Sequence, residues 1–506
     1  MVCINKYDWY GKDNDNSGSF VAVIYLKFQK FIFLHLPEIS DADESFNLEL
    51  IIMQVIGTII SLIFIVIVAF LLYKKYNAQA VLLFSGLFMM AFALLFGFGL
   101  PGLKDPTGLK FFDLFELIKE SLSTKGADVG LMIMAIGGYV AYMKKIGASE
   151  TLVYLSMKPL SVFKKYPYLA ASLVIPIGQL LFITTPSATG LGLLLVASIF
   201  PVLVSLGVSK TSAVSVIVAC TVFDMGPASA NTARASELIG KSNVQYFIEN
   251  QLPLAIPLTI LMAIVYFFVN RYYDKKENHA VEVVDTTALK MKAPLFYGIL
   301  PVLPLILLIV FSKFFTFFKP AVNLDTTTAM IFSLFVALIF EMIYKRNVSE
   351  VFNSLKIFWE AMGKVFATVI TLIISAEVFS FGLISLGFIN SLVSVSQDFG
   401  FGAIGIGIVM TIMIFGASML MGSGNASFFS FGPLVPGIAL KMGVDSAGII
   451  LPMQLASSLG RATSPIAGVV IATAEIAGIT PYQLAKRNLI PLTTVLIAML
   501  IFHFIF

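Results

Sequence analysis

Long apolar runs dominate the chain, and short polar breaks interrupt a few of them. From Leu48 onward the apolar runs approach about 20 residues, the length that a helix needs to cross the hydrocarbon core of a bilayer. These runs therefore predict membrane-spanning helices. They lie at 48–73, 79–100, 129–143, 211–226, 252–270, 295–311, 328–344, 366–386, 447–460 and 489–506.

Two shorter stretches alternate apolar and charged residues at helical spacing. In 111–122 a face of phenylalanine, leucine and isoleucine opposes four charged side chains, and 351–362 is amphipathic at the corresponding place later in the chain. Helices of this kind lie in the interface between lipid and water. We therefore predict one such helix in each half.

Two apolar stretches carry a polar, glycine-rich break near their middle: 168–206 is broken at 186–192, and 400–440 is broken at 421–427. Unpaired backbone groups are not tolerated in hydrocarbon, so an unwound segment at membrane depth must be buried in protein or line a wet cavity. We interpret both stretches as re-entrant hairpins, with a helix kink in a packed bundle as the alternative. Paired interruptions in the two halves of a transporter point to its substrate site.

The same order of elements occurs twice, at a nearly constant offset. The matched positions are Gly147 with Gly387, Ser187 with Ser423, and Gly226 with Gly460, at offsets of 240, 236 and 234. This pattern predicts an internal repeat. The predicted organisation is an amino-terminal extension at 1–47, a first repeat at 48–270, a charged linker at 271–293 and a second repeat at 294–506. Five spans and one hairpin in each half make the repeats inverted.

Composition sets the class of protein. Hydrophobic residues make up 58% of the chain and charged residues only 12%, whereas soluble proteins carry about 25% charged residues. The fold class is therefore an all-α polytopic membrane protein with two inverted repeats and broken helices at the midplane. The topology places 19 core cations on one side and nine on the other, which puts the linker in the cytoplasm and both termini outside.

The sequence offers little for catalysis or metal binding. Cys3 and Cys220 are too few for a disulfide framework, and we find no metal constellation, phosphate-binding loop or catalytic triad. We therefore expect no cofactor, no enzyme activity and no nucleic-acid partner. A membrane enzyme and a channel are the competing classes: an enzyme would carry a nucleophile and base or a metal set, and a channel would conduct without saturable exchange.

Four polar segments converge in this topology: the two hairpin tips and the breaks at 226–231 and 460–464. They supply hydroxyl and amide side chains, and helix N-termini whose free N–H groups and partial positive charge suit an anion. The candidate substrate-binding residues are Ser187, Thr189, Gly190, Ser229, Asn231, Ser423, Gly424, Asn425, Arg461, Thr463 and Ser464.

Arg461 is the strongest single candidate. A cation at membrane depth costs roughly 2.5–3.5 kcal/mol on insertion scales and usually has a function, and a guanidinium matches a carboxylate bidentately. The alternatives are an ion pair with Glu475 and a side chain that reaches to the membrane interface. Asp224 is the candidate for a coupling proton or sodium ion, against a structural role as a hydrogen-bonded acid. We read Glu341 and Glu377 as interfacial or helix-pairing residues.

These segments resemble a known family. The runs at 187–192, 422–426 and 459–461, with Ser464-Pro465 and with 137–147, look like the anaerobic C4-dicarboxylate carriers of the DcuC type. The resemblance covers about 48–506, and it implies a secondary carrier of the ion transporter superfamily in the bacterial inner membrane. In that superfamily the hairpin tips bind carboxylate, which here corresponds to Ser187, Thr189, Ser423 and Asn425.

The function implied is transport of succinate, fumarate and malate, by exchange or with a coupled cation, through an elevator-like movement of the hairpins and broken spans against the other helices. A carrier for another organic anion or an amino acid is the alternative. The expected partners are small dicarboxylate anions and membrane lipid, and a homodimer is one candidate assembly.

Overall fold

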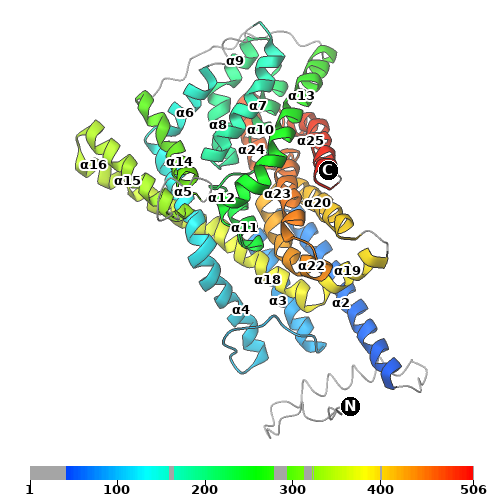
Figure 1. The fold of residues 1–506 in the computed structure, drawn as a ribbon. Helices are drawn as coiled ribbons and strands as arrows, with labels where there is room; N and C mark the ends of the chain where they lie inside the picture. The colour runs from blue at the N-terminus through cyan, green and yellow to red at the C-terminus, as the bar shows by residue number, and fades with distance from the viewer. Residues whose placement is uncertain are drawn as a thin grey trace.

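The computed structural model describes residues 42–158, 165–277, 293–312, 322, 324–398 and 402–504. Within these ranges the chain folds into helices joined by turns, without a strand (Figure 1). Nine helical segments of the described chain are long and apolar enough to cross a membrane. The predicted all-α polytopic membrane fold is therefore confirmed. Positions 1–41 of the predicted extension and 278–292 of the predicted linker lie outside the described residues.

The helices of the first half are α2 (Ala42–Tyr73), α3 (Ala78–Leu95), α4 (Lys110–Lys125), η1 (Gly126–Gly130), α5 (Leu131–Lys145), α6 (Ala148–Met157), α7 (Pro167–Thr184), α8 (Ala188–Ser198), α9 (Phe200–Ser205), α10 (Lys210–Ala219), α11 (Ala230–Ile239), α12 (Asn243–Tyr246), η3 (Phe247–Gln251) and α13 (Leu252–Lys276).

The helices of the second half are η4 (Leu295–Val302), α14 (Leu303–Val310), α15 (Thr326–Lys345), α16 (Val348–Ser354), α17 (Lys356–Val365), η5 (Phe366–Ile370), α18 (Thr371–Ser385), α19 (Phe388–Asp398), α20 (Gly402–Met421), α21 (Gly424–Phe431), η6 (Gly432–Leu434), α22 (Val435–Met442), α23 (Ser446–Ala462), α24 (Gly468–Ala477) and α25 (Pro481–Phe504).

The two amphipathic stretches form helices, but they are not separate elements. Helix α4 continues through the π-helix η1 into α5, and the segment α16–α17 leads through the π-helix η5 into α18. No proline stands at either junction, and Gly126 keeps right-handed helical angles, so the chain absorbs an extra residue in a π-turn instead of ending the helix. Each amphipathic stretch is therefore rigidly connected to the span that follows it.

The predicted span at 211–226 is wrong. Helix α10 ends at Ala219, and residues 220–229 form an irregular loop before α11 begins. Phe223 and Gly226 in this loop have φ angles of 59° and 98°, which a helix does not allow, and Pro227 lacks the N–H that a helix interior needs. The polar interruption is therefore longer than the sequence suggested, and α10 with α11 makes one broken span.

Structural details recur at the predicted offset of the internal repeat. The π-helices begin at 126 and 366, and the left-handed glycines Gly147 and Gly387 stand at φ of 79° and 76°; both pairs differ by 240. Ser187 and Ser423 each accept a hydrogen bond from the backbone at the start of the helix after the tip. These coincidences support the repeat, and the inversion and the boundaries of the halves stay predictions.

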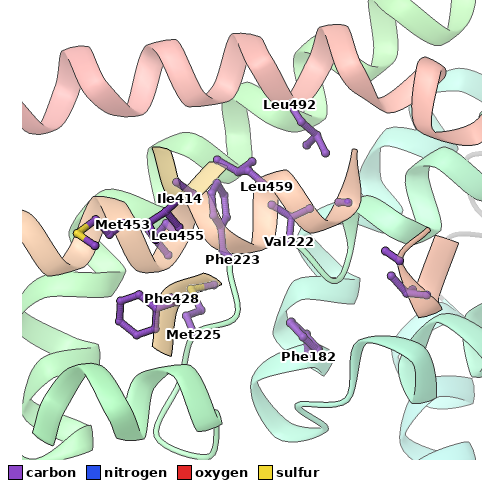
Figure 2. Packing of buried hydrophobic residues seen from close by; sticks show 14 of the residues in the cluster. Phe182, Val222, Phe223, Met225, Ile414, Phe428, Met453, Leu455, Leu459 and Leu492 are labelled. Carbon is purple, nitrogen blue, oxygen red and sulfur yellow. The ribbon is translucent and has the colours of Figure 1, made fainter. Parts of the chain in front are cut away.

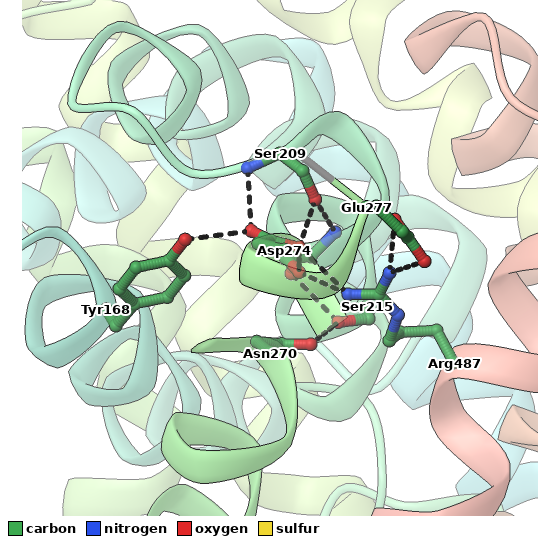
Figure 3. A network of polar contacts seen from close by, with 8 residues as sticks. Tyr168, Ser209, Ser215, Asn270, Asp274, Glu277 and Arg487 are labelled. Atoms are coloured by element: carbon green, nitrogen blue, oxygen red, sulfur yellow. Dashed lines mark hydrogen bonds and ion pairs between the residues drawn. The ribbon is translucent and has the colours of Figure 1, made fainter. Parts of the chain in front are cut away.

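A buried polar cluster ties the start of α10 to α13 and α25 (Figure 3). The Asp274 carboxylate accepts hydrogen bonds from Ser209 and Ser212 at 2.7 and 2.6 Å and from Arg487 at 3.0 Å. Arg487 in turn donates to both carboxylate oxygens of Glu277. Every charge in the cluster has a partner of opposite sign, so it fixes the end of α10 that lies away from the irregular loop.

Candidate functional site

The first hairpin turns at Ser187. Helix α7 ends at Thr184, and Ser187 has the extended backbone of an N-cap, with its Oγ accepting a hydrogen bond from the Gly190 N–H at 3.2 Å. A side chain at Gly190 would bring its Cβ within 2.8 Å of that Oγ. The tip therefore needs a glycine for close approach, and the Ser187 side chain is exposed there.

The second hairpin turns in the same way. Gly422 takes a left-handed φ of 69°, and the Ser423 Oγ accepts a hydrogen bond from the Ala426 N–H at 3.2 Å. A Cβ on Gly424 would lie 2.9 Å from the Ser457 carbonyl oxygen of α23, so this tip packs closely on the second broken span. No hydrogen bond joins the half-buried Asn425 amide to another described residue, which leaves it available to a ligand.

Both hairpin tips meet the break between α23 and α24. A Cβ on Gly422 would touch the Ile466 backbone at 2.9 Å, and a Cβ on Gly468 would stand 3.5 Å from the Thr189 hydroxyl. Residues 463–467 therefore lie between the two tips. The convergence that the sequence predicted holds for these three segments, which come from far apart in the chain.

The loop at 220–229 brings Asp224, Ser229 and Asn231 together. The Asp224 carboxylate accepts hydrogen bonds from the Ser229 hydroxyl at 2.7 Å and from the Asn231 amide at 3.2 Å. Ser229 also caps α11, since its Oγ accepts from the Asn231 and Thr232 N–H groups. The buried Oδ1 of Asn231 has no partner among the described residues, so one acceptor remains in this otherwise satisfied cluster.

Two glutamines that the sequence analysis missed hold this loop in place. Gln454 on α23 donates to the Asp224 carbonyl at 2.9 Å and accepts from Gln251 at 3.0 Å and from the Tyr246 hydroxyl at 2.8 Å. Gln251 accepts the Gly226 N–H at 3.0 Å. The signal was available for Gln454, which is an uncharged polar residue inside an apolar run, because such a side chain must find a partner when buried. Gln251 follows Glu249 and Asn250, so the sequence around it gave no such signal.

Apolar side chains anchor the same loop. Val222 and Phe223 are fully buried, and they belong to the same buried apolar cluster as Leu459 of α23 (Figure 2). The left-handed backbone at Phe223 is thereby held by packing on one side and by the glutamines on the other. Strained backbone of this kind persists only where its surroundings determine it, and it often marks functional segments.

Arg461 links the two broken spans. Its Nη2 donates to the Thr221 carbonyl at 2.6 Å, and its buried Nε has no partner in the described part of the chain. The positive charge also interacts with the Asp224 carboxylate. The alternative pairing with Glu475 is not made among the described residues, and Glu475 is exposed. Arg461 therefore points to the other half and not to the membrane interface.

Thr463 and Ser464 are buried and bond to their own segment. The Thr463 hydroxyl donates to the Gly460 carbonyl at 2.8 Å, and the Ser464 Oγ accepts from the Ile466 N–H at 3.3 Å. Both shape the break between α23 and α24.

The two remaining buried glutamates have partners of their own. Glu341 accepts a hydrogen bond from the Tyr297 hydroxyl at 2.6 Å and pairs with Lys345 at 3.1 Å. Glu377 belongs to an ion-pair cluster described below.

Four helices begin around this centre, namely α8, α11, α21 and α24. Each leaves backbone N–H groups at its first turn, where the helix dipole is positive. Serine hydroxyls cap three of the four, and one guanidinium stands beside them. The site can therefore bind a small anion through neutral donors and one cation. The described residues contain no group of three or more metal-binding side chains.

The fold is shared with solved transporters. The YdaH transporter of Alcanivorax borkumensis superposes with a TM-score of 0.57 at 14% identity, over 85% of this chain and 98% of that one. MtrF of Neisseria gonorrhoeae gives a TM-score of 0.57 at 12% identity, over 88% of this chain and 94% of that one. The chain thus has the fold of a class of multi-pass membrane transporters.

Sequence comparison narrows the class. The family described as C4-dicarboxylate anaerobic carriers, DcuC, matches residues 56–506, and the chain belongs to this family. Relatives include the anaerobic C4-dicarboxylate transporters DcuC of Escherichia coli CFT073, 35% identical, and of E. coli K12, 34% identical; each comparison covers 88% of this chain and 96% of the relative. A probable transporter of the same name from Vibrio cholerae is 34% identical with the same coverage. The family resemblance inferred from the sequence is confirmed.

Proposed function

We propose that the protein is a secondary active transporter of C4-dicarboxylates, with succinate, fumarate and malate as substrates, in the bacterial cytoplasmic membrane. The observation that carries this proposal is the meeting of both hairpin tips at the break beside Arg461. Capped helix N-termini and a guanidinium offer donors on several sides of one small volume. A dicarboxylate has two groups of acceptors to match them.

The proposed substrate ligands are the side chains of the tips and of the loop at 220–231. The exposed Ser187 hydroxyl and the unpartnered Asn425 amide come from opposite hairpins, so one carboxylate can bind at each tip. Ser229 and Thr463 act by holding the helix ends in position, because their hydroxyls are already engaged by neighbouring residues.

Asp224 is the proposed site of the coupling ion. Its carboxylate lies between Ser229 and Asn231, and the Asn231 Oδ1 beside it is an acceptor without a donor. A proton on the carboxylate or a sodium ion held by these oxygens would satisfy that acceptor. Exchange of one dicarboxylate for another and cotransport with a cation are both consistent with this arrangement.

The proposed mechanism is an elevator-like movement. The hairpins and broken spans pack on one another through the Gly424 and Gly468 contacts, so they move as one body. Helices α2–α5 and α15–α18 then form the scaffold, and α18 of this scaffold packs directly on α21 of the second hairpin. The substrate crosses the membrane with the moving body.

The test is uptake of radiolabelled succinate by proteoliposomes that contain the purified protein, with a sodium gradient and a pH gradient imposed separately. We expect saturable uptake that unlabelled fumarate and malate inhibit. Labelled serine, an amino acid without a second carboxylate, tests the amino-acid alternative in the same proteoliposomes. Saturable uptake of serine without uptake of succinate would reject the dicarboxylate assignment in favour of an amino-acid carrier.

A further inference from the structure

A cluster of four charged side chains joins the proposed moving body to the proposed scaffold, away from the substrate centre. Arg234 and Glu237 lie on α11, Lys125 ends α4, and Glu377 lies on α18. Two cations and two carboxylates give the cluster no net charge. We call these four residues the boundary cluster.

Some contacts within the boundary cluster join the moving body to the scaffold, and others lie within one of these two bodies. Across it, Lys125 Nζ lies 2.5 Å from Glu237 Oε1, and Arg234 Nη2 lies 3.9 Å from Glu377 Oε1. Within the moving side, Arg234 Nη1 lies 2.6 Å from Glu237 Oε2. Within the fixed side, Lys125 Nζ lies 3.4 Å from Glu377 Oε1. Each carboxylate is therefore shared between the two cations.

We propose that the boundary cluster is an ion-pair latch that opens during transport by dividing into two neutral pairs, Arg234 with Glu237 on the moving body and Lys125 with Glu377 on the scaffold. This inference rests on the proposed elevator mechanism. Leaving one partner of a buried ion pair alone is strongly unfavourable. Division along these lines leaves no charge alone on either side, so the latch can open at a moderate cost.

The burial of the four side chains fits this division. The Arg234 side chain has no exposed surface, and its partner Glu237 stays with it on the same helix three residues away. Lys125 and Glu237, which make the short contact across the boundary, are 25% and 22% exposed. The two groups that lose the shorter cross-boundary contact are therefore the ones that water can already reach, whereas the other cross-boundary contact, between Arg234 and Glu377, is longer at 3.9 Å. The Ser121 hydroxyl adds a hydrogen bond to Glu377 at 3.4 Å, which keeps that carboxylate on the scaffold.

A cavity of about 490 Å³ lies near the end of α11, between α12–η3 on one side and α5, α14 and the start of α15 on the other. Met132 and Asn243 line this cavity, and the Asn243 amide donates a hydrogen bond to the Met132 sulfur at 3.1 Å. Apolar packing also joins α18 to the second hairpin, where the Phe379 and Phe431 rings meet edge to face with 6.0 Å between their centroids. The charged contacts of the latch act together with this packing, so their effect is measured as a difference between variants that share it.

The test is a double-mutant cycle with Lys125→Gln, Glu377→Gln and the two combined. Each single change leaves one scaffold charge without its partner once the latch opens, so both should favour the closed state. The combined change removes the scaffold pair as a unit and leaves Arg234 with Glu237, so it should allow opening again. Damage to packing would add up in the double variant, whereas the latch predicts recovery.

The readout is the distance between spin labels on cysteines placed at Lys110 of α4 and Lys241 beyond α11, with Cys3 and Cys220 replaced by serine and alanine. Measured by pulsed electron spin resonance in proteoliposomes without substrate, the parent should show two distances. In each single variant, the fraction of molecules at the distance of the open state should be about tenfold lower, which is the change that 1.4 kcal/mol produces. The double variant should return this fraction to within about twofold of the parent. Glu116→Gln with Lys119→Gln, an exposed pair inside α4 at 2.7 Å, is the matched control and should change nothing.

A single distance in all variants, or a double variant no more open than the singles, would overturn the latch. Because the distances are measured without substrate, this outcome does not depend on which anion is carried. Succinate uptake by the parent in the same proteoliposomes tests the proposed function separately. If the single variants insert poorly, the melting temperature of each purified protein identifies misfolding, and the recovery in the double variant still decides the question.

Discussion

Replacing Arg461 with glutamine is the most direct test of the substrate site. The Arg461 guanidinium donates one hydrogen bond to the Thr221 carbonyl at 2.6 Å, and its Nε has no partner among the described residues. Donors therefore remain for a carboxylate. A hydrogen bond to a charged group contributes about 1.5–3 kcal/mol, so the loss of two such bonds, partly replaced by the glutamine amide, should cost about 3 kcal/mol. This corresponds to a dissociation constant roughly 100-fold higher.

The Arg461→Lys variant distinguishes the contribution of the positive charge from that of the planar guanidinium. Lysine keeps the positive charge and loses the planar fork that binds a carboxylate bidentately. We expect succinate affinity to fall about tenfold in this variant, between the parent and Arg461→Gln. Affinity is measured by calorimetry on purified protein, and uptake is measured in proteoliposomes at equal protein content.

Arg461 also stabilises the fold through its contact with Thr221, so the assay must distinguish lost stability from lost substrate affinity. Without its guanidinium the buried Thr221 carbonyl loses a donor, which lowers stability by about 1–3 kcal/mol. The melting temperature of each variant reports this effect independently of affinity. Lys119→Gln, which changes an exposed cation on α4, is the control for removing a positive charge. If Arg461→Gln inserts correctly and binds succinate with parental affinity, whatever its melting temperature, the substrate role is refuted and Arg461 only joins the two broken spans.

Three further predictions concern the tips, the packing and the topology. Ser423→Ala removes the N-cap of α21 and should weaken succinate binding modestly. Asn425→Ala should weaken it more, by about tenfold, because that amide is free for the ligand. Succinate affinity equal to that of the parent in both variants would reject the tip as a site. Gly86→Ala, whose Cβ would lie 2.4 Å from the Val378 carbonyl, should lower stability by about 1–3 kcal/mol in thermal melts, whereas Gly363→Ala, which meets open space, should not. A cysteine in place of His279 should resist membrane-impermeant reagents applied from outside, and its labelling would refute the cytoplasmic linker.

The sequence predicted the all-helical membrane fold and the two glycine-rich breaks because their signal is local. The span predicted at 295–311 forms a shorter apolar helix, whereas α7 and α20, the first arms of the predicted hairpins, are long and apolar enough to cross a membrane. An apolar run of about 20 residues indicates a membrane span without reference to the rest of the chain. A glycine-rich break within such a run indicates an unwound backbone. Ser187 and Ser423 were predicted only as substrate-binding residues, and their role as N-caps agrees with the preference of short hydroxyl residues for that position. These elements needed no knowledge of tertiary contacts.

The remaining features depended on contacts between distant segments. The conformation of the loop at 220–229 depends on two distant glutamines. Gln251 binds the Gly226 N–H from 25 residues away, and Gln454 binds the Asp224 carbonyl from 230 residues away. The boundary cluster likewise joins α4, α11 and α18, and its charges look like ordinary interfacial residues in sequence. Helix α11 was missed because its residues are mostly small and polar, so it lacks the apolar run that marks a span.

The two breaks carry opposite charges, and this asymmetry bears on coupling. The first contributes Asp224 and the second contributes Arg461, so these two ionised side chains together carry no net charge. A bound dicarboxylate adds two negative charges, and moving an uncompensated charge through a membrane is costly. A proton or sodium ion at Asp224 offsets one of them, and a second cation would offset the other. Cotransport therefore favours at least two cations per substrate, whereas exchange of one dicarboxylate for another moves the same charge in both directions and requires none. The dependence of succinate uptake on membrane potential distinguishes these cases, because exchange should not respond to it.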